Sequence, residues 1–102
     1  MSKPQNETQL LKVARADVAD AIDYYNGQEL GLGADFASEV RKTIERILQY
    51  PNAWAQVSKR TRRCQVNRFP YGVFYSLETD VVVVIAVLHR HREPRTWQTR
   101  EE

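Results

Sequence analysis

Eight consecutive apolar residues, VVVVIAVL at positions 81–88, constrain the fold of this chain more than any other feature. Six of the eight side chains are β-branched, which favours a strand over a helix. The run is far shorter than the roughly 18–20 apolar residues that cross a bilayer. A strand with one face in water alternates apolar and polar residues, whereas a strand covered on both faces is continuously apolar. We therefore expect residues 81–88 to form the central strand of a sheet, buried on both faces.

Other strands are expected on either side of this run in the sequence. RRCQVNRF (62–69) alternates, PYGVFYSL (70–77) follows it, and ETD (78–80) provides a turn. Because the connections are only a few residues long, these strands and the apolar run should form an antiparallel meander. A shorter apolar run, TQLLKVA (8–14), has the length of a further strand.

The periodicity of the first half predicts two helices. The first begins at Ala16, and three glycines within residues 26–35 end it. The second runs from Phe36 to Leu48, with Pro51 just beyond its end. A short glycine-rich connection should make the pair an antiparallel hairpin. The apolar stripes are Val18, Ala21, Ile22 and Tyr25 in the first helix and Phe36, Val40, Ile44, Ile47 and Leu48 in the second; Asp17, Asp20 and Asp23 are expected to point away from the first stripe.

The order β-α-α-β-β-β describes one α+β domain over residues 1–102, with a helical hairpin covering one face of a small antiparallel sheet. The length of 102 residues is typical of a single domain. Residues 1–7 are expected to form a loose arm, residues 50–61 a connecting loop, and residues 94–102 a basic tail. The polar start, MSKPQNETQ, lacks the apolar segment of a signal peptide, which predicts a cytoplasmic protein without membrane attachment.

The positive charge is concentrated in the second half of the chain. The net charge is only +2, but residues 59–102 hold nine Lys and Arg against five Asp and Glu, while residues 1–58 hold six against eight. The stretch KRTRRCQVNR (59–68) has five cations and no acid. Like charges at this density repel one another unless they are solvated or face an anionic partner. A solubilising surface and a binding surface are both consistent with this pattern.

The stretch VLHRHREPRTW (87–97) combines two histidines with three arginines. His89 and His91 are two residues apart, so on a strand they would share a face and could reach one ion. Glu93 is the only acid nearby and the arginines repel a cation, so no metal site is predicted. The single cysteine, Cys64, allows no disulfide or multi-cysteine zinc site within the chain, and we expect it to be a small strand residue.

Acid/base cleavage of RNA is a chemistry that these residue types could perform. Attack of a 2′-hydroxyl on its own phosphodiester needs a base, an acid and cations that hold the developing charge. His89 and His91 could be the base and the acid. The cations could come from Arg60, Arg62, Arg63, Arg68, Arg90 and Arg92, and Tyr71, Tyr75 or Trp97 could stack on bases.

An interaction surface is the other interpretation of the same stretch. Trp and Arg are the side chains most often found as anchors of protein interfaces, and Arg95 and Trp97 form such a pair near the end of the chain. Alternatively, Trp97 folds back to cap the core while Arg95 is solvated.

Four stretches in this order resemble the RelE/ParE superfamily of bacterial toxins, the toxic halves of type II toxin–antitoxin pairs also called plasmid stabilisation proteins. The resemblance covers residues 9–97. It rests on ARADVADAIDYY, GLGADFASEVRKTIERILQYPNAW, RRCQVNRFPYGVFY and VLHRHREPRTW. The superfamily fold, a helical hairpin against an antiparallel sheet, agrees with the element order predicted above.

The superfamily has two mechanistic branches, and the resemblance favours the second. RelE-like members cut mRNA on the ribosome with arginines, lysines and often a terminal tyrosine or histidine, whereas ParE-like members inhibit DNA gyrase through protein–protein contact. Gly72 stands where the RelE-like pattern tends to have an arginine. After the last strand, where a catalytic tyrosine is typical, the chain has Arg92, Glu93 and Pro94 and then Trp97. The resemblance therefore favours a ParE-like toxin, which would not be an enzyme; a RelE-like member would be an endoribonuclease, and no cofactor is expected for either.

The resemblance assigns roles that differ between the branches. For a gyrase inhibitor, the contact residues would be Lys59, Arg60, Arg62, Arg63, Arg95 and Trp97. The alternative is a ribosome-dependent mRNA endoribonuclease, in which His89, His91, Arg90, Arg92 and Arg68 would be catalytic. A second alternative is an inactive homologue that only binds an antitoxin.

The resemblance also implies a partner. Such toxins are held inactive by an antitoxin encoded beside them, so a hetero-oligomer is expected. The antitoxin should be acidic where it meets the basic face, because charge complementarity speeds and orients association. Its hydrophobic anchors are expected in a groove beside the helical hairpin, near Tyr24, Tyr25 and Trp54.

Overall fold

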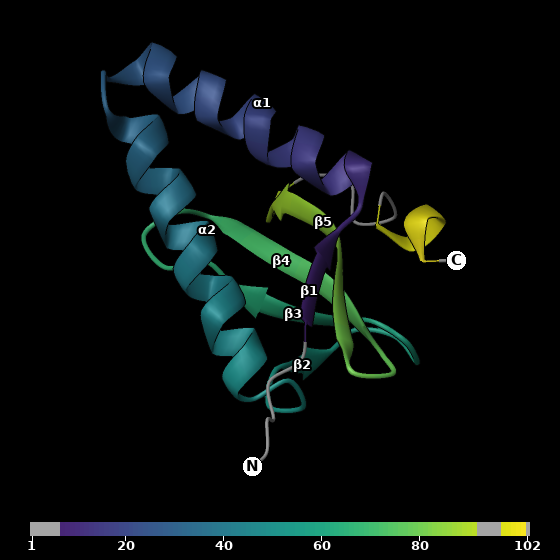
Figure 1. Ribbon diagram of the computed structural model, residues 1–102. Coiled ribbons are helices and arrows are strands. Elements are labelled where there is room, and N and C mark those ends of the chain that lie inside the picture. The colour runs from purple at the N-terminus through teal and green to yellow at the C-terminus, as the bar shows by residue number, and fades with distance from the viewer. Residues whose placement is uncertain (1–6, 92–96, 102) are drawn as a thin grey trace.

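The computed structural model describes residues 7–91 and 97–101 and places a hairpin of two helices on one face of a five-stranded sheet (Figure 1). Neither helix in this part of the chain has the length and apolar content that crossing a membrane requires. The elements are β1 (Glu7–Leu10), α1 (Lys12–Gln28), α2 (Leu32–Gln49), β2 (Ala55–Gln56), β3 (Arg62–Gln65), β4 (Tyr71–Glu78), β5 (Val81–His89) and a 3₁₀ turn (Gln98–Arg100).

The α+β class and the meander of the last three strands are confirmed, but the sheet is mixed. The strand order is β1-β5-β4-β3-β2, so β5 lies inside the sheet between β1 and β4. Strands β2 to β5 are antiparallel, whereas β1 runs parallel to β5, with Glu7 paired to Val81 and Leu10 to Val84. The helical hairpin and the meander lie between β1 and β5 in the chain, and this long crossover allows parallel pairing. The prediction of a wholly antiparallel sheet was therefore wrong.

The first strand is shorter, and the first helix longer, than the sequence predicted. β1 ends at Leu10 and α1 begins at Lys12, so residues 12–14 are helical. Ala14 is completely buried, and it lies four residues before Val18 on the same helical stripe. The helical period therefore begins within the run that was expected to be a strand.

Other boundaries also moved. α1 continues through Gly27 to Gln28 and α2 begins at Leu32, before the predicted start at Phe36, so only Gly31 of the three glycines lies in the connection.

Residues 50–61, expected to be a loop, contain the two-residue strand β2, which pairs with β3. The strand predicted for residues 62–69 ends at Gln65. Arg68 has a φ of 73° in the turn that follows, and the backbone N–H of Val66 donates to the carbonyl of Tyr71 across this turn. The chain thus reverses direction earlier than the alternating pattern indicated.

β5 is covered on both faces, as its continuous apolar sequence predicted. α1 packs on β5, and α2 packs on β3 and β4. A β-bulge interrupts the pairing, because Phe74 is paired with Ala86 while Tyr75 is paired with Val84, which leaves Ile85 as an extra residue. Val82, Val84 and Val87 lie in the core beneath the helices; Ile85, Ala86 and Leu88 lie in a second cluster with Phe74 and Trp97, which we call the outer cluster.

The C-terminal segment covers the outer cluster. Trp97 is only 6% exposed, and its ring stacks on Phe74 with 5.4 Å between the centroids and 19° between the planes. The structure therefore agrees with the alternative in which Trp97 caps the core, and not with an exposed anchor. Glu101 accepts hydrogen bonds from the hydroxyls of Ser58 and Thr61, which fastens this segment to the loop before β3.

Asp17 also departs from its expected position, because its carboxylate faces the sheet and the C-terminal segment. It accepts a hydrogen bond from the backbone N–H of Val87 at 2.9 Å and pairs with the guanidinium of Arg100 at 2.7 Å. Arg100 also donates to the carbonyl of Ile85 at 3.1 Å. We call Trp97, Arg100 and Glu101 the C-terminal clamp, since together they connect the chain end to α1, β5 and the loop before β3.

The clamp predicts that Trp97→Ala destabilises the domain. Removing a buried Trp side chain typically costs about 3–5 kcal/mol, which for a domain of this size lowers the thermal midpoint by roughly 10 °C or more. Circular dichroism melting would measure the change, with Gln98→Ala as an exposed neighbouring control. An unchanged midpoint for Trp97→Ala would contradict the burial of Trp97 against Phe74.

The close approach of the two helices makes a second prediction, at Gly33. A Cβ on Gly33 would lie 2.6 Å from the carbonyl oxygen of Ile22, whereas a Cβ on Gly27 would meet nothing within 4 Å. Gly33→Ala should lower the free energy of unfolding by about 1–3 kcal/mol through steric overlap. Gly27→Ala should be neutral or raise it by up to about 1 kcal/mol. Denaturant titration of both variants would show equal effects if the helices were not in contact at Gly33.

Candidate functional site

The residues that the sequence singled out lie at two ends of the sheet. β4 is antiparallel to both neighbours, so Tyr71 pairs with His89 at one end, while Arg62 pairs with Tyr75, four residues further along. Four residues of strand span about 13 Å. We call the region of Arg68, Tyr71, His89, Arg90 and His91 the His89 end, and the region of Lys59, Arg60 and Arg62 the Arg60 end.

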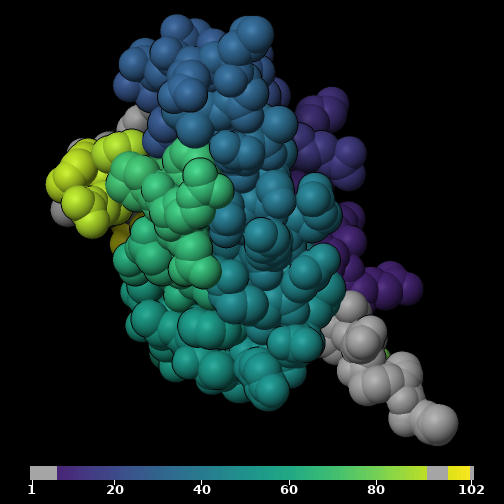
Figure 2. All heavy atoms as spheres, turned by 90° about the vertical axis from the view of Figure 1, so that its left-hand side faces the viewer, coloured from purple at the N-terminus to yellow at the C-terminus, as the bar shows by residue number. Residues whose placement is uncertain are grey.

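At the His89 end, the last residues of β5 lie beside the turn between β3 and β4. The backbone N–H of Arg90 donates to the carbonyl of Pro70 at 2.8 Å, which joins the two segments. In Figure 2 the end of β5 (yellow-green) protrudes beside this turn (green), below the blue tip of the helical hairpin. Charged residues from two segments distant in sequence therefore share one surface.

The two histidines are close together, as their spacing predicted. The ring of His89 is half-buried and meets Tyr71 edge-on, with centroids 5.3 Å apart. His91 is exposed; its ring centroid lies 5.4 Å from that of His89, and its backbone N–H donates to Nδ1 of His89 at 3.1 Å. Among the described residues, no three His, Cys, Asp or Glu side chains form a group able to hold a metal ion.

Arg68 is close to two carboxylates. Its guanidinium nitrogens lie 3.7 Å from a carboxylate oxygen of Asp35 and 3.6 Å from one of Glu39, both on α2. The guanidinium carbon, Cζ, lies 5.6 Å from the centroid of the Phe69 ring. Glu39 is buried, and the positive charge of Arg68 offsets its negative charge. Arg68 therefore holds the turn against α2. Because the two carboxylates partly neutralise its charge, it would attract a phosphate less strongly than an unpaired arginine.

Arg62 and Arg63 point to opposite faces of the sheet and have different surroundings. Arg62 donates to the carbonyls of Asn52 at 3.1 Å and Trp54 at 2.8 Å, so its side chain is engaged with the segment that follows α2. The side chain of Arg63 passes over Gly72 on the neighbouring strand, because a Cβ at Gly72 would lie 3.0 Å from Nε of Arg63. The absence of a side chain at Gly72 thus makes room for the arginine of the neighbouring strand.

Lys59 and Arg60 are exposed at the Arg60 end. They line a hollow of about 330 Å³. Two large apolar side chains are exposed nearby, each to 37%: Leu77 lines the same hollow, and Val57 lies two residues before Lys59 in the chain. Arg60, one of the cations considered for RNA cleavage, therefore lies at the opposite end of the sheet from His89, as does Lys59. Arg92 and Arg95 fall outside the described residues.

Of the three aromatic residues predicted near an antitoxin groove, Tyr24 and Tyr25 are in contact, with ring centroids 5.1 Å apart, whereas Trp54 lies elsewhere. Tyr24 is 58% exposed near the end of α1. Tyr25 packs among Phe36, Phe69 and Tyr71, and burial raises the pKa of its phenol. Trp54 follows the far end of α2 and packs against the core. Since α2 has 18 residues, about 27 Å of helix separates Trp54 from the hairpin tip.

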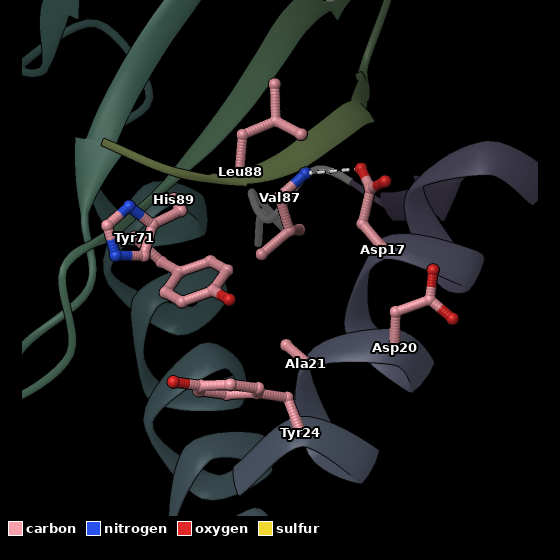
Figure 3. A pocket seen from close by; sticks show the side chains of 8 residues that line it. All are labelled: Asp17, Asp20, Ala21, Tyr24, Tyr71, Val87, Leu88 and His89. Atoms are coloured by element: carbon pink, nitrogen blue, oxygen red, sulfur yellow. Dashed lines mark hydrogen bonds between the residues drawn. The ribbon is translucent and has the colours of Figure 1, made fainter. Parts of the chain in front are cut away.

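Sequence reasoning missed a pocket of about 230 Å³ between α1 and β5, which we call the α1–β5 pocket (Figure 3). Asp17, Asp20 and Tyr24 line it at positions i, i+3 and i+7 of α1, and this spacing was the available signal. Its remaining lining residues are Ala21, Tyr71, Val87, Leu88 and His89.

Burial raises the pKa of two other side chains, Cys64 and Tyr75. Cys64 is 1% exposed, and burial raises the pKa of its thiol, so the nucleophilic thiolate is disfavoured. Burial also raises the pKa of Tyr75 to about 12, and its hydroxyl donates to the carbonyl of Pro51. Cys64 is therefore a structural strand residue, as expected.

Comparison with known proteins identifies the family. Residues 9–94 match the family model described as "ParE toxin of type II toxin-antitoxin system, parDE". No curated protein matches the chain. A solved structure described as "Chromosomal ParDE TA system from P. aeruginosa" superposes with a TM-score of 0.74 at 12% identity, covering 83% of this chain and 96% of that one, which shows a shared fold. Because the family model spans most of the sequence, this chain belongs to the ParE toxin family of type II toxin–antitoxin systems.

Proposed function

We propose that this ParE-family toxin inhibits DNA gyrase by protein–protein contact and is neutralised by a cognate antitoxin encoded beside it. The observation that carries the proposal is the match of residues 9–94 to the ParE family model. The toxin would act as a binding protein in the cytoplasm and would need no cofactor.

The distribution of cations supports contact over catalysis. A phosphodiester cleavage site needs a base, an acid and cations within a few ångströms of one phosphate. Here Arg68 is near Asp35 and Glu39, and Arg60 lies beyond Arg62 at the other end of the sheet. Asp20 and His89 line the same pocket, and a carboxylate there would repel an RNA phosphate.

The Arg60 end is the surface we assign to the target. Lys59 and Arg60 are exposed, and Val57 and Leu77 add apolar area beside them. Interfaces commonly combine apolar contact with charged groups that steer association. Within this end we assign the target contact to Lys59 and Arg60, because the side chain of Arg62 is bound to two carbonyls; Trp97, the aromatic residue predicted to join them, is buried.

One observation favours the endoribonuclease as a second candidate. His89 and His91 form a pair with ring centroids 5.4 Å apart at the end of β5, and Arg90 lies between them in the chain. Two imidazoles at this separation could serve as base and acid for one phosphodiester.

Induced expression in a bacterial host distinguishes these functions. We expect growth arrest with an SOS response and cleaved DNA–gyrase complexes, and we expect the purified chain to inhibit supercoiling by gyrase. Rapid arrest of translation with transcripts cut in the reading frame would instead identify the endoribonuclease. Unimpaired growth at verified expression of folded protein would contradict both toxic functions and leave the inactive antitoxin-binding homologue.

Substitutions at the two ends of the sheet locate the active surface. Combining Lys59→Ala with Arg60→Ala should weaken gyrase inhibition about tenfold, because two contact charges are lost. Arg41→Ala, an exposed cation on α2, is the matched control. For an endoribonuclease, His89→Ala or His91→Ala should instead reduce cleavage by about 10²–10⁴-fold. Truncation after Pro94 is unsuitable, since it removes the C-terminal clamp.

A further inference from the structure

The α1–β5 pocket differs in chemistry from the basic surfaces assigned so far. Tyr24 and Tyr71 contribute two aromatic rings, and in Figure 3 the hydroxyl of Tyr71 points toward the space between α1 and β5. Ala21 and Val87 form an apolar floor. The volume of about 230 Å³ lies below the roughly 300–1,000 Å³ of typical small-molecule sites. The pocket therefore fits a single side chain better than a cofactor or nucleotide.

The acids of the pocket lie along one face of α1. Asp17 is already occupied: Arg100 approaches its two carboxylate oxygens at 2.7 and 3.3 Å. Asp20 lies one turn further along the helix, is exposed and lines the pocket; in Figure 3 its carboxylate is directed away from the two tyrosine rings, toward the outer side of α1. The Asp17–Arg100 pair shows that this face of α1 accepts a guanidinium, and Asp20 offers the next carboxylate on the same face.

These groups together match a long cationic side chain. The methylene stem of Lys or Arg packs on apolar surface while its charged end stays near solvent, which suits the floor and the rim of this pocket. The exposed ring of Tyr24 attracts a cation, and the Tyr71 hydroxyl and the Asp20 carboxylate can accept hydrogen bonds from it. An anionic group would meet the carboxylate of Asp20 and is disfavoured.

We propose that the α1–β5 pocket receives an arginine or lysine side chain of the cognate antitoxin. This inference rests on the antitoxin part of the proposed function. Charge complementarity selects the cation, and the antitoxin is the partner that membership of a toxin–antitoxin family implies. Tyr24, which is 58% exposed at the pocket, supplies apolar contact next to the charged group. The antitoxin thus carries a cation at this position, and is not uniformly acidic along the toxin.

The first test measures the affinity of the toxin for the protein encoded by the adjacent reading frame. Asp20→Asn should weaken binding about tenfold or more, because a charge-assisted contact is lost, and should make binding less sensitive to salt. Tyr24→Ala should weaken it about threefold to tenfold. Asp23→Asn removes an exposed carboxylate of α1 that does not line the pocket, and it should change the affinity less than twofold.

The second test identifies the cation on the antitoxin. Each antitoxin arginine and lysine is replaced by alanine and combined with Asp20→Asn in a double-mutant cycle. One position should lose most of its effect when Asp20 is already Asn. Thermal melting of each toxin variant confirms that it is folded.

A third test is independent of any partner. N-acetyl-arginine amide, titrated to tens of millimolar, should shift the NMR signals of Ala21, Tyr24 and Val87. The neutral citrulline analogue should not, and Asp20→Asn should abolish the shifts.

The outcomes separate this inference from the function on which it rests. Wild-type affinity of folded Asp20→Asn and Tyr24→Ala, or equal weakening by Asp23→Asn, would overturn the pocket assignment. Retained antitoxin binding with loss of gyrase inhibition would assign the pocket to the target and also overturn it. A wild-type toxin that binds no protein from the adjacent frame would refute the proposed neutralisation, and the inference with it, whatever the NMR result.

Discussion

The burial of β5 on both faces is the constraint on which the rest of the structure depends. A strand with eight consecutive apolar residues is stable only if water is excluded from both faces, because each fully buried aliphatic side chain contributes about 1.5–3 kcal/mol. The helical hairpin covers one face, and the C-terminal clamp covers the other. The bulge at Ile85 decides which side chains of the run belong to which face.

The Asp17–Arg100 pair joins these two layers. Both side chains are largely buried, with 14% and 19% of their surfaces exposed, so removing one partner would leave the other with an uncompensated charge. Asp17 also accepts a hydrogen bond from the backbone N–H of Val87, a residue of β5. One carboxylate of α1 thus couples the helix, the central strand and the chain end, and the pocket with Asp20 begins one helical turn away.

Local patterns predicted the features that depend on local sequence. The two helices, the order of the elements other than the short β2, and the contact between His89 and His91 follow from spacings of a few residues. The parallel edge strand β1, the bulge and the burial of Trp97 depend on contacts between distant segments; Asp17 and Arg100 are 83 residues apart. Lys59 and His89 both lie in the basic half of the sequence. Nothing in the local pattern of that half shows that they lie near opposite ends of β4.

The proposed function requires one small domain to bind two partners, and the separation of charge along the sheet offers a physical basis for this. The Arg60 end is basic and partly apolar, while the α1–β5 pocket is acidic and aromatic. A partner that complemented only the basic residues would gain nothing from Asp20, and a partner that filled only the pocket would leave Lys59 and Arg60 solvated. Specificity between partners is a difference of affinities, and two surfaces of opposite charge allow each partner to be favoured at one surface and penalised at the other. On the assignments proposed here, an antitoxin is distinguished from the target by its cation and not by acidity alone.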